Sequence, residues 1–372
     1  MTRTSRQSPK RLSLLIGVIA LILASIYAIQ VLADADWDAT VFVGLGEDAE
    51  EIRAYAEDRL GPVQLRPQLG HDGRFFFVQA NDPWILSPED NAYILDRPLY
   101  RSQRMFYPSL AGGFGTFGPE AIVWAMLLVN LVAMGFGAWA VAEIAVVIGR
   151  STWWGLAFPL NLGFISELGV GGAGIVAGAA AFGALALLMK GNTWAAVVLL
   201  TVAALSREVM LVVAAGAAFY LWRREEKGRA RVVVGMPLGA VVGWAFYLRL
   251  RMGFDSGLAE LQEVGIPFVG LVDAFESWVN DPLDLIVGVT VLLVLGLFVV
   301  RAILHDNLIA WAFIGFVPLT MMLTEQVWHS YFDITRAVAP VLTAFVLLVV
   351  LENRVQPQHA SGLGSTKHAG RS

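Results

Sequence analysis

Two neighbouring side chains with acid–base chemistry, His71 and Asp72, open the stretch HDGRFFFVQANDP at residues 71–83. A carboxylate can accept a proton from a hydroxyl group, and an imidazole beside it can tune its basicity. The same aspartate would also suit the N-cap of a helix that runs through the phenylalanines and ends before Pro83. Two roles are therefore open for this acid, a general base and a helix cap.

A helix over this stretch would place its aspartate and its aromatic rings on one face, at the spacing of Asp72, Phe75, Phe76 and Gln79. Such a face is typical of a helix at the boundary between membrane and water. We therefore expect the phenylalanine rings to lie in lipid and the carboxylate to lie at the surface.

Four arginines have the chemistry to bind phosphate, because the planar guanidinium group matches two phosphate oxygens. Two lie in YRSQRMFYPSLA (100–111), one in ALSREVMLV (204–212) and one in FDITRAVAPVL (332–342). Each also has a structural alternative, since arginine often reaches to lipid head groups or pairs with a nearby acid. The four are Arg101, Arg104, Arg207 and Arg336, and the acids close to them in sequence are Glu208 and Asp333.

Further candidates have weaker positions. Asp34, Asp36 and Asp38 follow the first apolar stretch and rival Asp72 as the key acid, and His329 is more typical of an interfacial histidine than of a ligand. No His, Asp or Glu cluster has a recognisable metal-binding spacing, and the chain has no cysteine. We predict no metal and no required cofactor, and a divalent cation bound only by carboxylates has no support in the sequence.

These residues must be positioned by a very apolar chain. Of its 372 residues 57% are hydrophobic and 15% are charged, against roughly 25% charged in an average soluble domain. Several runs reach the length of about 20 apolar residues that crosses a hydrocarbon core. The sequence therefore predicts an all-α polytopic membrane protein and excludes a water-soluble fold. The basic run RREEKGRAR (223–231) is typical of a turn near anionic lipid, and no nucleic-acid partner is expected.

Hydropathy predicts about ten transmembrane helices. Residues 152–165 and 193–205 are short for full spans, so a partial or broken helix is the alternative at either place. Gly174 and Gly178 have the small-residue spacing that permits close helix packing. The expected spans are residues 12–32, 121–148, 152–165, 169–189, 193–205, 209–222, 232–250, 283–300, 308–323 and 334–351.

Positive charge predicts the orientation of these spans, because short cytoplasmic turns are rich in Lys and Arg. The first eleven residues carry four basic side chains and no acid. Alternate threading places on the same side Arg150, Lys190, the cluster 223–231, Arg301 and the basic residues of the C-terminal tail. Both termini are therefore expected in the cytoplasm, in a bacterial inner membrane. Residues 1–351 form one transmembrane domain, and residues 352–372 are predicted to be a disordered cytoplasmic tail.

The same threading places residues 34–118, 206–208, 251–282 and 324–333 outside. Residues 34–118 contain 14 acids and seven arginines, and they far exceed the length of a simple connection. Within them, Ile52, Tyr55, Ala56 and Leu60 would share one side of an amphipathic helix. We therefore expect a large, partly helical first external loop that carries the chemistry.

Four motifs, in order and on one predicted side, resemble a known group. HDGRFFFVQANDP, YRSQRMFYPSLA, ALSREVMLV and FDITRAVAPVL are similar to segments of bacterial integral-membrane proteins related to the GT-C glycosyltransferases. That superfamily includes protein mannosyltransferases and lipid A aminoarabinose transferases. In the bacterial group, the corresponding first-loop stretch has the form Tyr-Asp-Gly-Gln-Phe-Tyr-Tyr followed by Ala and Asp-Pro, so His71 replaces the usual Tyr and Arg74 the usual Gln. The resemblance extends from about residue 12 to residue 351.

The resemblance implies many transmembrane helices, a catalytic first external loop and a sugar donor carried on a polyprenyl phosphate. It also implies an acid near the chemistry, which is Asp72 by position. The acceptor would be a cell-envelope glycan, a lipid or a protein. Two other classes remain open: a transporter or flippase, which would concentrate ionisable residues at mid-membrane, and a non-catalytic membrane scaffold.

Overall fold

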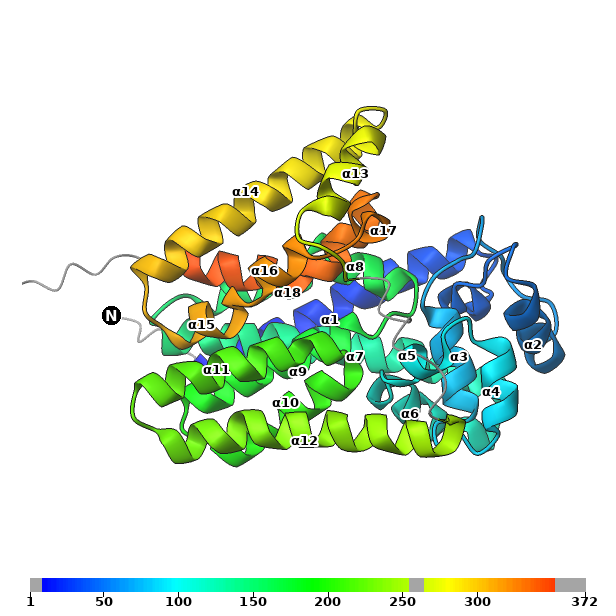
Figure 1. Cartoon of the computed structure of the whole chain (residues 1–372), viewed down its shortest axis with the longest axis horizontal. Helices are drawn as coiled ribbons and strands as arrows, with labels where there is room; N and C mark the ends of the chain where they lie inside the picture. Colours follow the sequence, from blue (N-terminus) through cyan, green and yellow to red (C-terminus); the bar gives the residue numbers. More distant parts are fainter. Residues whose placement is uncertain (1–8, 254–263, 352–372) are drawn as a thin grey trace, which may run out of the picture.

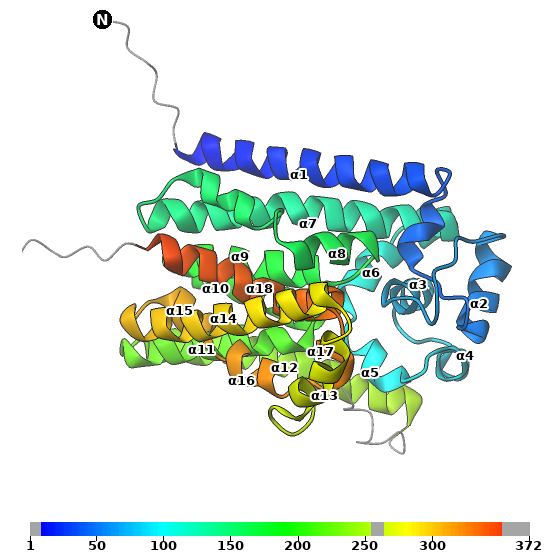
Figure 2. The same cartoon turned by 90° about the horizontal axis from the view of Figure 1, so that it is seen from above.

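The apolar runs form a bundle of helices in the computed structural model, which describes residues 9–253 and 264–351 (Figures 1 and 2). Within these residues, extended pairing is limited to three isolated bridges. Five helices are long and apolar enough to cross a membrane, so the prediction of a helical membrane protein holds, whereas the predicted number of about ten spans is not confirmed. The five are α1 (Pro9–Asp34), α7 (Pro119–Val147), α12 (Lys227–Met252), α14 (Pro282–Leu304) and α18 (Tyr331–Val350).

Two of the other predicted spans are broken. Residues 152–165 divide into the 3-10 helix η3 (Thr152–Ala157) and α8 (Leu162–Gly169). Asn161 caps α8, and its amide also donates to the Ala339 carbonyl and the Thr343 hydroxyl of α18, so contacts with a distant helix stabilise this break. The segment 308–323 divides at Gly315 into α15 (Leu308–Ile314) and α16 (Phe316–Met321). The remaining predicted spans are α9 (Gly174–Met189), α10 (Thr193–Ser206) and α11 (Leu211–Arg223).

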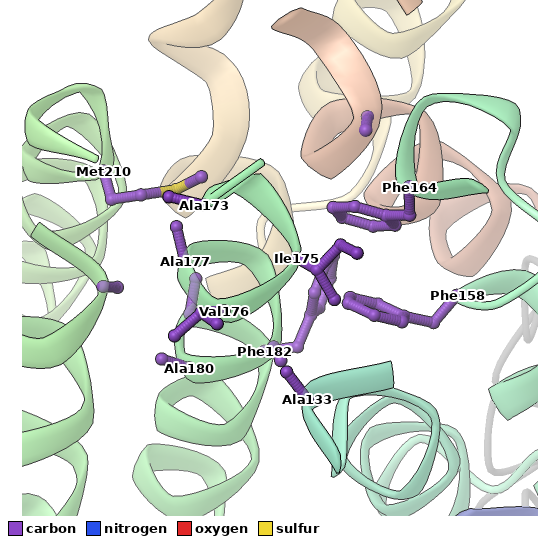
Figure 3. Close-up of a cluster of buried hydrophobic side chains, with 14 of the residues drawn as sticks. Ala133, Phe158, Phe164, Ala173, Ile175, Val176, Ala177, Ala180, Phe182 and Met210 are labelled. Atoms are coloured by element: carbon purple, nitrogen blue, oxygen red, sulfur yellow. The ribbon is translucent and has the colours of Figure 1, made fainter. Parts of the chain in front are cut away.

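Helix α9 lies at the centre of the bundle, and nearly all of its residues are buried. Phe158 stacks on Phe164 with ring centroids 4.2 Å apart, and both rings lie against α9 (Figure 3). A Cβ on Gly178 would lie 2.6 Å from the Phe164 ring, so only glycine permits this approach. The predicted close packing at this glycine is confirmed, and it fixes α8 against α9.

Five short helices of the outer segment gather at one end of the bundle (Figure 2). In the first of them, which contains residues 50–60, the side chains of Ile52 and Ala56 are buried, as the amphipathic pattern predicts. These helices are α2 (Glu50–Leu60), α3 (Gly73–Asn81), α4 (Pro88–Ile94), α5 (Pro98–Ser102) and α6 (Phe106–Gly112).

The phenylalanines of α3 are buried inside the protein, so the prediction that they lie in lipid is wrong. Phe76 packs edge-on against Tyr107 of α6 with centroids 5.3 Å apart, and Phe77 packs against Tyr55 of α2. The physical reason is that α2 and α6 cover the apolar side of α3. The three rings therefore anchor the start of α3 to protein and not to the bilayer.

The end of α12 holds the outer segment by hydrogen bonds to main-chain carbonyls. Trp244 Nε1 donates to the Ser102 carbonyl at 2.8 Å, and Tyr247 Oη donates to the Trp84 carbonyl at 2.6 Å. Arg251 donates twice to the Ile85 carbonyl, at 3.0 and 2.8 Å. Helix α12 is thus connected to both ends of the stretch 84–102.

Helix α1 begins, and α18 ends, at the end of the bundle opposite to α2–α6 (Figures 1 and 2). This is the relative placement that the predicted threading requires, and the assignment of these ends to membrane sides stays a prediction. The predicted tail 352–372 and the part 254–263 of the predicted outer segment lie outside the described residues.

Candidate functional site

Asp72 is the centre of a charged cluster at the outer-segment end of the bundle. It occupies the N-cap position of α3, but its side chain makes no capping hydrogen bond. Instead, its carboxylate accepts from Arg101 Nη1 at 3.2 Å and from Arg336 Nη2 at 3.2 Å, and Arg104 Nη1 lies 3.8 Å away. Two arginines from the segment 100–111 and one from α18, all distant from residue 72 in sequence, therefore surround the acid singled out by its position next to His71.

Two glutamates extend this cluster. Arg104 approaches Glu208 with both Nε and Nη2, each 3.3 Å from a carboxylate oxygen. Arg207 Nη1 lies 3.1 Å from Glu167, and the same Glu167 oxygen lies 3.4 Å from Arg336 Nε. The neighbours Arg207 and Glu208 thus serve different partners, so the interpretation that they pair with each other is wrong. The reason is that Arg207 ends α10 in an extended conformation, which separates the two side chains.

Glu167 is a site residue that the sequence reasoning missed. It lies on α8, is only 2% exposed and joins two arginines through one carboxylate. The backbone N–H of Gly174 donates to its second oxygen at 3.3 Å, and a Cβ on Gly172 would lie 1.5 Å from that oxygen. A single acid inside an apolar run was the available signal, because burying an unpaired charge in a membrane domain is costly.

Asp96 and Arg74 were also missed, and they lie on the other side of Arg101. Asp96 accepts two bonds from Arg101 at 3.0 Å each, a paired geometry that orients the guanidinium group. The Phe75 ring lies beneath Arg101, with the guanidinium carbon 3.8 Å from the ring centroid, and Arg74 is 4.5 Å from the same centroid. Arg74 is buried, and its Nε and Nη1 have no acceptor among the described residues.

The electrostatic environment sets the protonation of the His71–Asp72 pair. Burial alone would raise the pKa of Asp72, but the guanidinium groups of Arg336 and Arg101 outweigh it and hold that pKa well below its usual range. Burial, together with the positive charges of Arg336 and Arg66, lowers the pKa of His71 to about 4. At neutral pH the pair is therefore an ionised carboxylate beside a neutral imidazole. While the arginines hold it, Asp72 is a weak base.

The remaining candidates lie around this cluster or away from it. Asp333 Oδ1 is 3.3 Å from Arg336 Nη1, which is the predicted local pair. Asp38 caps the 3-10 helix η1 (Ala39–Val43) through the Thr40 N–H, while Asp34, Asp36 and His329 are exposed. In the part of the chain that the structure describes, none of these last four residues is ion-paired to the arginines around Asp72.

The carboxylates around Asp72 are separated from one another by arginines. Over residues 9–253 and 264–351, no group of three His, Asp or Glu side chains is arranged to hold a metal ion. The cluster is instead built to hold oxyanions, since guanidinium groups bind carboxylate and phosphate with the same geometry.

Comparison of the chain with known proteins identifies no relative. No family model matches the chain, and no curated protein or solved structure matches it. Its function must therefore be argued from the cluster around Asp72 and from the four motifs that supply it.

Proposed function

We propose that the chain is a membrane glycosyltransferase of the GT-C type, which moves a sugar from a polyprenyl-phosphate donor to a cell-envelope acceptor. The observation that supports this most is the convergence of Arg101, Arg104 and Arg336 on the Asp72 carboxylate. Such a transfer requires cations that bind the lipid phosphate and a carboxylate that accepts the proton of the acceptor hydroxyl. The proposed setting is the external face of a bacterial inner membrane, with both termini in the cytoplasm.

The arginines already hold an oxyanion, the Asp72 carboxylate, so a phosphate would bind by exchange. In the proposed mechanism the donor phosphate replaces the Asp72 carboxylate as the hydrogen-bond acceptor of Arg101 and Arg336. The pKa of Asp72 then rises, because these two positive charges now stabilise the phosphate. Asp96 and Glu208 keep Arg101 and Arg104 in place during this exchange. Donor binding thus converts a weak base into a competent one.

The transfer then follows from these positions. Asp72 accepts the proton of the acceptor hydroxyl, and the acceptor oxygen attacks the anomeric carbon of the sugar. The bond between that carbon and the phosphate oxygen breaks, and the polyprenyl phosphate leaves with the electron pair. The arginines stabilise the negative charge that develops on the leaving phosphate. Arg74, with two buried nitrogens that lack acceptors, adds capacity for this charge.

The direct test compares wild type with Asp72→Asn, using purified protein and a set of polyprenyl-phosphate sugars. Sugar transfer should fall by about 100-fold or more, the scale of a lost general base. Asp36→Asn is the matched control, because Asp36 is exposed and its positive φ of 53° is one that Asn tolerates. Equal turnover by wild type and Asp72→Asn would remove Asp72 from the mechanism.

A transporter or flippase is the second candidate, and the broken helices at Asn161 and Gly315 favour it. The charged side chains around Asp72, however, belong to the outer segment or lie near helix ends, and Arg336 is only the sixth residue of α18. Absence of turnover with every donor, together with substrate movement across liposomes, would support the transporter. Absence of both would support the scaffold.

A further inference from the structure

A pocket of about 340 Å³ lies beside the Asp72 cluster, between the end of α1, the outer segment and α8. This volume lies within the range of small-molecule sites, roughly 300–1,000 Å³. Phe332 contributes to its wall and also lies against His71, with ring centroids 4.9 Å apart, and against Arg336. Phe332 is therefore shared with the surroundings of the cluster, but none of the residues that line the pocket belongs to the group of arginines and acids around Asp72.

The cation of this pocket is Arg66, whose charge has no carboxylate partner. Its Nη2 donates to the Gly169 carbonyl at 2.8 Å and to the Val41 carbonyl at 3.4 Å. Its Nε is buried without an acceptor, and no described acid forms an ion pair with it. Burial lowers the pKa of Arg66 accordingly. A guanidinium group oriented by carbonyls but lacking an anion is arranged to receive one.

The other lining residues narrow the chemistry of the ligand. Gln64, Ser166 and Asp34 supply hydrogen-bond donors and acceptors that suit hydroxyl groups. Tyr27 and Val31 belong to the membrane-spanning helix α1, seven and three residues before its last residue, so the pocket opens near the boundary of the apolar span. A ligand here would meet the positive charge of Arg66, the carboxylate of Asp34, which can accept from a hydroxyl group, neutral polar groups and an adjacent apolar surface.

We propose that this pocket binds a hydroxyl-bearing phosphate group, with the phosphate on Arg66 and the hydroxyls on Gln64 and Ser166. The head group of phosphatidylglycerol and free glycerol phosphate share this chemistry. The first would arrive from the bilayer and the second from solution. The inference does not depend on the proposed sugar transfer, because no residue of the Asp72 cluster is needed to hold the ligand.

The test uses the full chain in nanodiscs of phosphatidylcholine, with phosphatidylglycerol added in one arm and soluble glycerol phosphate in the other. Native mass spectrometry measures retained phosphatidylglycerol, and calorimetry measures binding of the soluble probe. Binding in either arm supports the proposal and identifies the source. Arg66→Gln should weaken that binding by roughly tenfold or more, since charge-assisted hydrogen bonds are lost.

Three further variants keep the result decisive. Ser166→Met fills the pocket without removing the charge and should also weaken binding, whereas Arg59→Gln, at an exposed arginine of α2, should bind as wild type does. Binding in neither arm, or wild-type affinity in Arg66→Gln or Ser166→Met, would overturn the proposal. Asp72→Asn should retain binding, which separates failure of this site from failure of the proposed transfer.

Discussion

Replacement of Glu167 by Gln is the most demanding test of the charged cluster. The substitution keeps the shape of the side chain but removes the charge that faces Arg207 at 3.1 Å and Arg336 at 3.4 Å. Arg336 keeps Asp72 and Asp333 as partners, whereas Arg207 loses the carboxylate with which it pairs. The Arg207 side chain is only 18% exposed, so its charge stays largely out of water. Breaking one side of a buried ion pair costs about 3–5 kcal/mol, and we expect a loss of this size in the free energy of unfolding.

The matched control is Asp333→Asn, which removes another acid from Arg336. The Asp333 side chain is 40% exposed, and an exposed pair contributes only about 0.2–1 kcal/mol. Circular dichroism during unfolding in mixed detergent micelles measures both changes. In the double variant Glu167→Gln, Arg207→Gln the two costs should be less than additive, because one unpaired charge is gone. If Glu167→Gln costs no more than Asp333→Asn, the buried network does not stabilise this end of the bundle.

Three further predictions concern stability. The pKa of His71 is about 4 in the folded protein and near 6.5 in the unfolded chain. Between these two pH values the unfolded chain binds more protons than the folded protein, so the free energy of unfolding falls as the pH drops from about 6.5 to about 4. His71→Gln should flatten that acid-side loss in unfolding measured between pH 7 and 4.5, and an unchanged slope would contradict the assignment. Gly172→Ala should lower the melting temperature, because its Cβ would lie 1.5 Å from Glu167, while Gly235→Ala, with nothing within 4 Å, should leave it unchanged or higher. Trp244→Phe removes the bond to the outer segment and should speed amide exchange over residues 98–102, while equal exchange would show that α12 does not hold that stretch.

The sequence predicted those parts of the molecule that depend on local pattern. Helix α2 and the extent of α3 followed from periodicity and from Pro83, and four motifs supplied the groups around Asp72. The phenylalanines of α3 were misplaced because lipid and protein interior are equally apolar, so hydropathy alone does not distinguish them. The predicted number of about ten spans is not confirmed, and the sequence left a broken helix open at residues 152–165 without deciding for it. The break at Asn161 is stabilised by α18, 178 residues further along the chain, and local sequence carries no record of that contact.

The attachment of α12 to the outer segment has a mechanical consequence. Its hydrogen bonds reach Trp84 and Ser102, on either side of the stretch that contains Arg101. A helix that spans a bilayer changes its tilt when the hydrocarbon thickness changes. A tilt of α12 would therefore pull on the backbone next to Arg101 and alter its distance from Asp72. A change in lipid chain length would therefore change the distance between Arg101 and Asp72 without any ligand bound there.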